Sequence, residues 1–113
     1  MPDKRWDADG LRRSFKGVAE DAERYVGQIK ARSKNPGAGD EMLLAEHEAK
    51  FRVYDHLSVN RALISREEFL AELAKMRAES AAPPRRGVNS AEFQKWYEYF
   101  IKDLIEQHRL HRG

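Results

Sequence analysis

Two copies of one short pattern locate helix starts in this chain. Residues 64–69 and 88–93 both read apolar, small polar, two spacers, Glu, Phe. In such a capping box, Ser65 or Asn89 accepts a hydrogen bond from an otherwise unpaired N–H of the first helical turn, and the glutamate reaches back to the capping residue's own N–H. The preceding apolar residue and the Phe add a hydrophobic staple. The pattern therefore predicts helices that begin directly after Ser65 and Asn89.

Apolar spacing extends this prediction to four helices, over residues 8–32, 40–59, 66–79 and 90–109. In the first, apolar residues recur at alternate intervals of four and three, which gives a narrow stripe on a helix. That stripe consists of Leu11, Phe15, Val18, Ala22, Tyr25 and Ile29, with Val26 beside it. The second helix is expected to bury Leu43, Leu44, His47, Phe51, Tyr54 and Leu57. Together these elements predict an all-α fold, a compact bundle of about four helices forming one domain over residues 1–113.

The helix predicted over residues 90–109 is the most apolar of the four. A helix on the surface of a bundle needs an apolar stripe only somewhat wider than about 100°. Here the apolar side chains cover nearly half of the circumference, and they are Phe93, Trp96, Tyr97, Phe100, Ile101, Leu104 and Ile105. We therefore expect this helix to be the central one, or to contact a partner as well.

Composition limits the classes of protein that fit. The chain has 113 residues and no cysteine, which excludes disulfides, a thiolate nucleophile and a zinc site built on cysteine. The first residues hold no apolar run typical of a signal peptide, and no stretch approaches the roughly 18 apolar residues of a membrane span. We expect a soluble, cytoplasmic protein. Its 21 Lys and Arg against 19 Asp and Glu leave a net charge of only +2, which is weak evidence for nucleic-acid binding.

The capping pattern also resembles the exit half of an EF-hand calcium loop. Counting back from Glu68 places Leu57, Val59 and Arg61 at positions where the loop needs oxygen ligands. Counting back from Glu92 fails in the same way, with Ala81, Pro83 and Arg85. The helix caps explain the pattern without calcium.

No other motif for chemistry is present. The sequence contains no Glu-x-x-His pair, no His-Glu-x-x-His and no phosphate-binding P-loop. Glu20 and Glu23 share a charged face with Lys16 and Arg24, which is typical of a solvated helix surface. His47 falls on an apolar face and is interpreted as a core histidine. If the protein were an enzyme, which is the third hypothesis, His47 would be the residue it uses, together with groups brought close by folding. We predict no catalytic residue, no metal and no cofactor, and hence no enzyme.

The remaining candidates are binding residues. For a protein partner, either another protein or a second copy of this chain, they are Trp96, Tyr99, Ile101 and Ile105 on the last helix. Tryptophan is enriched among residues that dominate binding energy, so Trp96 is the expected anchor. For phosphate groups the candidates are Lys30, Arg32, Lys34, Arg85 and Arg86.

The sequence thus favours a non-enzymatic protein-interaction module that acts as an adaptor, an inhibitor or a small subunit of a larger complex. The second hypothesis is a nucleic-acid-associated accessory protein, such as a small helical subunit of a ribonucleoprotein complex.

Overall fold

The computed structural model describes residues 6–32, 38–79 and 83–110, with Arg32, Ala38 and Leu110 described by their backbone alone. Within these ranges it contains four helices and no strand: α1 (Ala8–Arg32), α2 (Ala38–Val59), α3 (Arg66–Ala78) and α4 (Ser90–Leu110). The predicted all-α bundle of about four helices is confirmed. The helix boundaries agree with the predicted ones to within two residues, the largest difference being the start of α2 at Ala38 instead of Asp40.

The two helix starts located by the capping boxes are confirmed. The backbone N–H of Glu68 donates to Ser65 Oγ at 3.2 Å, and that of Glu92 donates to Asn89 Oδ1 at 3.0 Å. The returning half of the box is not made by Glu92 Oε2, which is buried and has no hydrogen-bond partner in the described part of the chain. The staple before α3 is also weak, because Ile64 is 64% exposed. These starts are therefore defined by the forward side-chain bonds together with the backbone bonds that Phe69 and Phe93 donate to the carbonyl oxygens of Ser65 and Asn89.

We expect Ser65→Ala and Asn89→Ala each to lower the free energy of unfolding by about 1 kcal/mol, because each leaves one N–H of the first turn without its acceptor. Chemical denaturation measures the change. Ser14→Ala, on the exposed face of α1, is the matched control and should not be destabilising, since alanine favours helix. Equal midpoints for all three variants and the parent would contradict the prediction.

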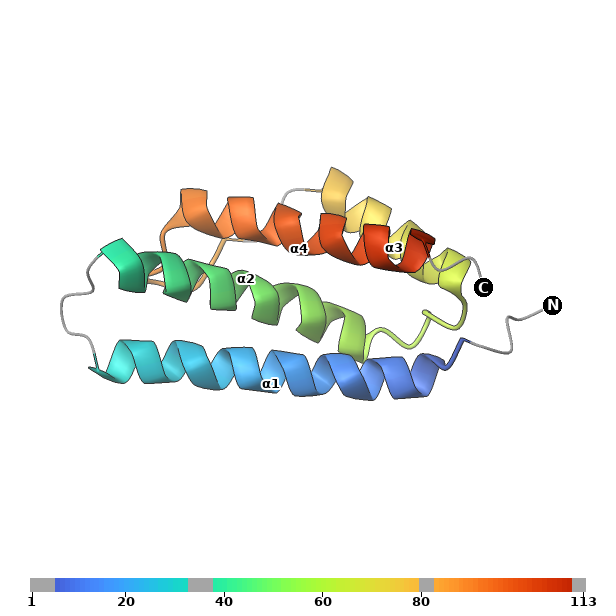
Figure 1. Ribbon diagram of the computed structural model, residues 1–113, viewed down its shortest axis with the longest axis horizontal. Helices are drawn as coiled ribbons and strands as arrows, with labels where there is room; N and C mark the ends of the chain where they lie inside the picture. Colours follow the sequence, from blue (N-terminus) through green and yellow to red (C-terminus); the bar gives the residue numbers. More distant parts are fainter. Residues whose placement is uncertain (1–5, 33–37, 80–82, 111–113) are drawn as a thin grey trace.

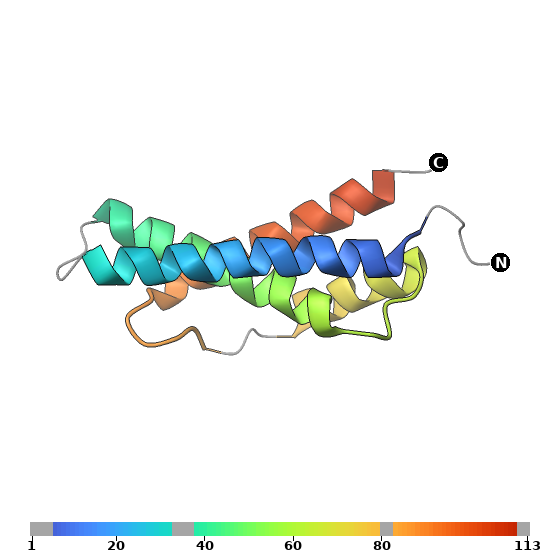
Figure 2. The same ribbon diagram turned by 90° about the horizontal axis from the view of Figure 1, so that it is seen from below.

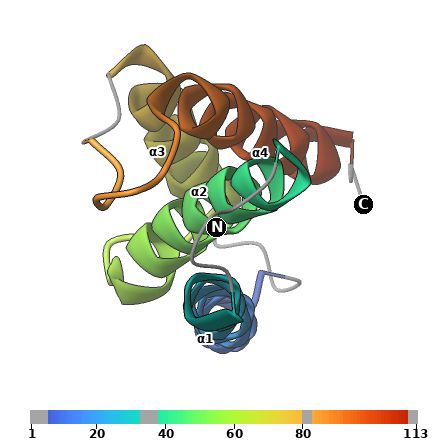
Figure 3. The ribbon, with the colours of Figure 1, turned by 90° about the vertical axis from the view of Figure 1, so that its left-hand side faces the viewer.

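Helix α2 lies at the centre of the bundle. It runs antiparallel to α1 on one side and packs against α4 on the other, while α3 packs on α4 (Figures 1 and 3). The prediction that the last helix is central was therefore wrong. The physical reason is that α2 carries fully buried Ala45 and Ala49, whose small side chains let neighbouring helices approach closely.

The main core joins side chains of all four helices, including Phe15, Leu57, Phe69 and Phe93. The buried face of α1 differs from the predicted stripe, because Ala19 is buried whereas Val18 is half-buried and Tyr25 is exposed. Val26, expected beside the stripe, is fully buried. The prediction favoured bulky side chains over a small one at the contact with α2.

A smaller apolar cluster of Val26, Ile29 and Leu44 lies between α1 and α2. Val88, just before α4, packs against both clusters and so connects them. None of the helices in the described ranges combines the length and the apolar content needed to cross a membrane.

Candidate functional site

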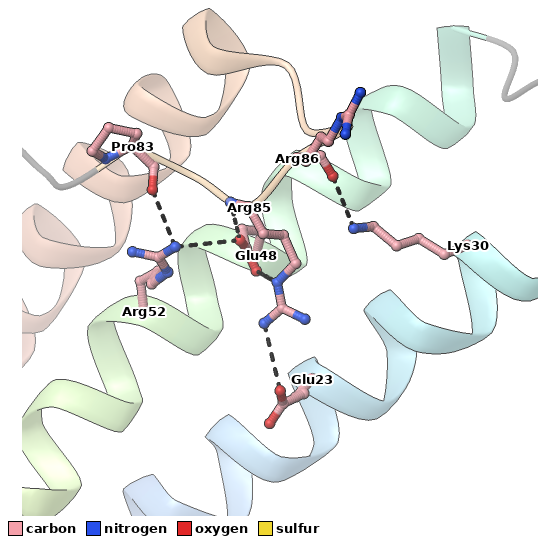
Figure 4. Close-up of polar contacts among 7 residues, drawn as sticks. All are labelled: Glu23, Lys30, Glu48, Arg52, Pro83, Arg85 and Arg86. Atoms are coloured by element: carbon pink, nitrogen blue, oxygen red, sulfur yellow. Dashed lines mark hydrogen bonds and ion pairs between the residues drawn. The ribbon is translucent and has the colours of Figure 1, made fainter.

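The side of α2 that faces the segment before α4 holds a buried carboxylate. Glu48 is 0% exposed and is the one charged side chain buried in the described ranges. Its Oε2 accepts a hydrogen bond from the backbone N–H of Arg85 at 2.9 Å. Its Oε1 lies 2.8 Å from Arg85 Nε, an ion pair that lacks the angle of a hydrogen bond, and Arg52 Nη2 is 3.7 Å from Oε2 (Figure 4). Glu48 therefore holds both the main chain and the side chain of Arg85.

Residues 83–87, which we call the strap, are fastened at further points. Arg52 donates to the carbonyl oxygen of Pro83 at 3.1 Å, and Lys30 Nζ donates to that of Arg86 at 3.0 Å (Figure 4). Gly87 closes the strap with a φ of 91°, a backbone conformation that glycine adopts without steric cost. Figure 2 shows this segment passing along one side of α1 and α2. The strap thus connects α4 to both helices of the α1–α2 pair.

Arg85 is the central cation of this network. Besides Glu48, its Nη2 lies 3.5 Å from Glu23 Oε1 of α1, and its guanidinium lies 5.4 Å from the ring centroid of Phe51. A guanidinium over an aromatic face is an attractive cation–π arrangement. Arg85 is therefore engaged by α1 and α2 at the same time.

The structure brings together three of the five predicted phosphate-binding residues, Lys30, Arg85 and Arg86. Arg85 is matched by two carboxylates and Lys30 by a carbonyl, whereas the Arg86 side chain is exposed. Lys34 and the Arg32 side chain lie outside the described residues. These cations could be identified from the sequence, but Glu48 was not predicted as part of the site. The sequence signal that could have identified Glu48 is its position on the helix, beside Ala45 and Ala49 and four residues before Arg52.

Aromatic side chains line the other side of α2. At about 100° per residue, Lys50 lies roughly 200° around the helix from Glu48. Lys50 Nζ is 5.8 Å from the ring centroid of Phe100, and the His47 ring is 4.2 Å from that of Tyr25. These contacts form part of a surface across α1, α2 and α4 that we call the aromatic band: Tyr25, His47, Lys50, Tyr54, Trp96, Tyr99 and Phe100.

Trp96 and Tyr99 form the α4 end of the aromatic band. Their ring centroids are 5.5 Å apart, and Trp96 also stacks on Phe100 at 6.0 Å. Tyr99 is 54% exposed, whereas Trp96 is half-buried and its Nε1 has no hydrogen-bond partner among the described residues. Two of the four predicted partner-binding residues thus lie together at the surface.

The other two predicted partner-binding residues lie on the opposite flank of α4. Ile101 is completely buried, so its prediction as a surface contact was wrong. Ile105 is half-buried against the main core. The reason is that α3 packs against α4 and covers apolar surface of that helix. The sequence did not indicate which helix would cover it.

His47 is half-buried within the aromatic band, and its Nδ1 has no hydrogen-bond partner in the described ranges. Burial lowers the pKa of His47, Glu46 opposes this effect and Lys50 adds to it. Burial likewise raises the pKa of Tyr54, with a further contribution from Asp103. No group of three or more His, Asp or Glu side chains in the described ranges is arranged to hold a metal ion.

The chain matches no protein-family model, and no curated protein or solved structure matches it significantly. Its class is therefore defined by its own structure, an all-α bundle of four helices with a buried carboxylate on one side of the central helix and aromatic rings on the other.

Proposed function

We propose that this protein is a non-enzymatic, cytoplasmic interaction module that binds another protein through the aromatic band, as an adaptor, an inhibitor or a small subunit. The observation that carries the proposal is the exposure of Tyr99 directly beside Trp96. Tyrosine and tryptophan dominate binding energy at protein interfaces because they bury much area with few rotatable bonds.

The position of the aromatic band supports this function. Its rings belong to three helices, so they are presented on a rigid surface that loses little conformational entropy when a partner binds. Trp96 rests on Phe100 of the core, which fixes its orientation, while Tyr99 stands further out. In a binding site of this kind, Trp96 would be the partly buried anchor and Tyr99 the exposed neighbour that contacts the partner.

The charges of the strap favour a protein partner over nucleic acid. Binding to phosphates requires cations that can exchange their counterions for the phosphate backbone. Arg85 and Lys30 are instead engaged within the chain. Two of the five candidate cations of the nucleic-acid alternative are therefore already engaged by groups of the chain itself.

The test is affinity purification from the cells that produce the protein, after nuclease treatment, with the wild type, Tyr99→Ala and the control Ile64→Ala. Ile64 is 64% exposed and lies outside the aromatic band, so it matches Tyr99 in exposure. We expect Tyr99→Ala to weaken binding by about 2 kcal/mol, roughly thirtyfold, and Ile64→Ala to leave it unchanged.

Circular dichroism should show equal helicity for both variants. Retention of the same partners by Tyr99→Ala would contradict the proposal. Loss of every partner of the wild type on nuclease treatment would favour nucleic acid instead.

A further inference from the structure

One side of α4 faces away from the helices that pack on it. Among the described helices, α2 and α3 contact α4 and cover two of its sides (Figure 3). On the uncovered side, side chains recur at intervals of three and four residues, which places them in one continuous line along a helix. We call this line the seam, and it consists of Glu92, Lys95, Tyr99, Lys102, Glu106 and Arg109.

The charges of the seam are available to groups outside the chain. Lys95, Lys102, Glu106 and Arg109 are exposed, and none of them makes a side-chain hydrogen bond or ion pair with another described residue. Glu92 is half-buried and its Oε2 is buried, so it is the least accessible residue of the seam.

The order of the charges is self-complementary when a second α4 lies antiparallel across the seam. In an interface with two-fold symmetry, each contact between two different residues occurs twice. With the axis between Tyr99 and Lys102, Lys95 faces the partner's Glu106. Toward the ends of the helix, the same symmetry places Glu92 and Arg109 at equal distances from the axis and therefore opposite each other.

The centre of the seam is complementary as well. Tyr99 faces the partner's Lys102, and an ammonium group over an aromatic ring is attracted by it. The acids that flank the seam also avoid like charges, because Glu98 lies nearest to the partner's Lys102 and Asp103 nearest to the partner's Tyr99. All facing pairs of the seam are therefore attractive.

Other arrangements of two α4 helices satisfy fewer of these pairs. A parallel pair in register would place every charge of the seam opposite an identical one. Shifting the antiparallel pair by one heptad leaves only four of the six seam positions with a facing residue. Complementary charges fix the register of an interface in this way, because misaligned like charges are unfavourable.

We propose that the seam of α4 is the interface of an antiparallel homodimer. The inference rests on the proposed function for the role of Tyr99, and it names a second copy of the chain as the partner at the α4 end of the aromatic band. Exposed charge pairs each contribute little, so the dimer is weak. We expect a dissociation constant on the order of 0.1–1 mM at low salt.

The first experiment is sedimentation equilibrium of the intact chain at concentrations up to about 1 mM. A monomer–dimer equilibrium is expected. Raising the salt from about 0.01 M to about 1 M shortens the screening length from about 30 Å to about 3 Å, so the dimer should weaken at least about tenfold. A chain that stays monomeric at about 1 mM in low salt would overturn the proposal.

Charge reversal at one facing pair tests the register. Lys95→Glu places two glutamates opposite each other, and Glu106→Lys places two lysines opposite each other, twice in each dimer. Each variant alone should therefore dimerise at least about tenfold more weakly than the wild type. An equimolar mixture of the two restores both attractive pairs, as does the double variant Lys95→Glu/Glu106→Lys. Both should recover a dissociation constant within about threefold of that of the wild type.

Two controls on α1 change the net charge by the same amounts. Arg13→Glu and Glu20→Lys alter exposed residues away from α4, so they should leave dimerisation unchanged. Equal effects of these controls and of the α4 variants would show that only the overall charge matters and would overturn the proposal. Failure of the double variant to recover the dimer would overturn it as well.

The dimer and the proposed function can fail separately. If Tyr99→Ala loses its cellular partners while the wild type stays monomeric, only the homodimer is wrong. If the charge-reversed variants behave as expected while Tyr99→Ala retains the same cellular partners, the homodimer stands and the binding of another protein through the aromatic band is wrong.

Discussion

Replacing Arg85 with alanine is expected to lower the free energy of unfolding by about 3 kcal/mol. The change removes the guanidinium that lies 2.8 Å from Oε1 of Glu48 and leaves the fully buried carboxylate without its main counter-charge. Breaking a buried ion pair in this way costs about 3–5 kcal/mol in other proteins. We expect the lower end, because Arg52 stays 3.7 Å away and the N–H of residue 85 can still donate to Oε2. Urea denaturation measures the loss.

Two further variants separate this effect from a general weakening of the strap. Arg86→Ala changes an exposed neighbour in the same segment and should shift stability by no more than about 0.5 kcal/mol. Glu48→Gln keeps an acceptor for the N–H of Arg85 but removes the buried charge. In that background Arg85→Ala should be much less destabilising than in the wild type. Similar losses in the free energy of unfolding for Arg85→Ala and Arg86→Ala would contradict the prediction, because the buried Glu48 carboxylate would then not depend on the Arg85 guanidinium.

Replacing Phe69 with alanine is expected to lower the free energy of unfolding by about 3–5 kcal/mol, because it empties the volume of a large core side chain. Phe69 is fully buried, and its ring centroid lies 5.8 Å from that of Phe15, 5.3 Å from that of Trp6 and 4.8 Å from that of His108. It therefore joins α3 to α1 and α4 at one end of the bundle. A domain of this size has a total stability of only about 5–15 kcal/mol, so the variant should be close to unfolding at room temperature.

The matched control is Leu70→Ala on the same helix. Leu70 is only partly buried, so its truncation removes less apolar contact and should be clearly less destabilising. Thermal melting followed by tryptophan fluorescence also reports on Trp6, which packs directly on the Phe69 ring. Equal melting temperatures for the two variants would mean that the aromatic cluster contributes little beyond helix formation.

The sequence by itself determined the helices and their starts. Ser65 and Asn89 act on backbone N–H groups three residues away, and the periodic apolar residues depend on helical geometry alone. Both are local effects, so they could be predicted without knowing how the helices pack. The contact between Tyr99 and Trp96 was accessible for the same reason, since the two residues lie three positions apart on one helix.

Only the tertiary structure decided which helix is central, and burial followed from that. Because α2 has neighbours on two sides, Glu48 is buried at a position where a charged residue would otherwise be expected in water. Its counter-charge comes from Arg85, 37 residues further along the chain, a pairing that no local pattern indicates. Ile101 was misassigned for the same reason, because whether an apolar flank is exposed depends on the helix that packs against it, here α3.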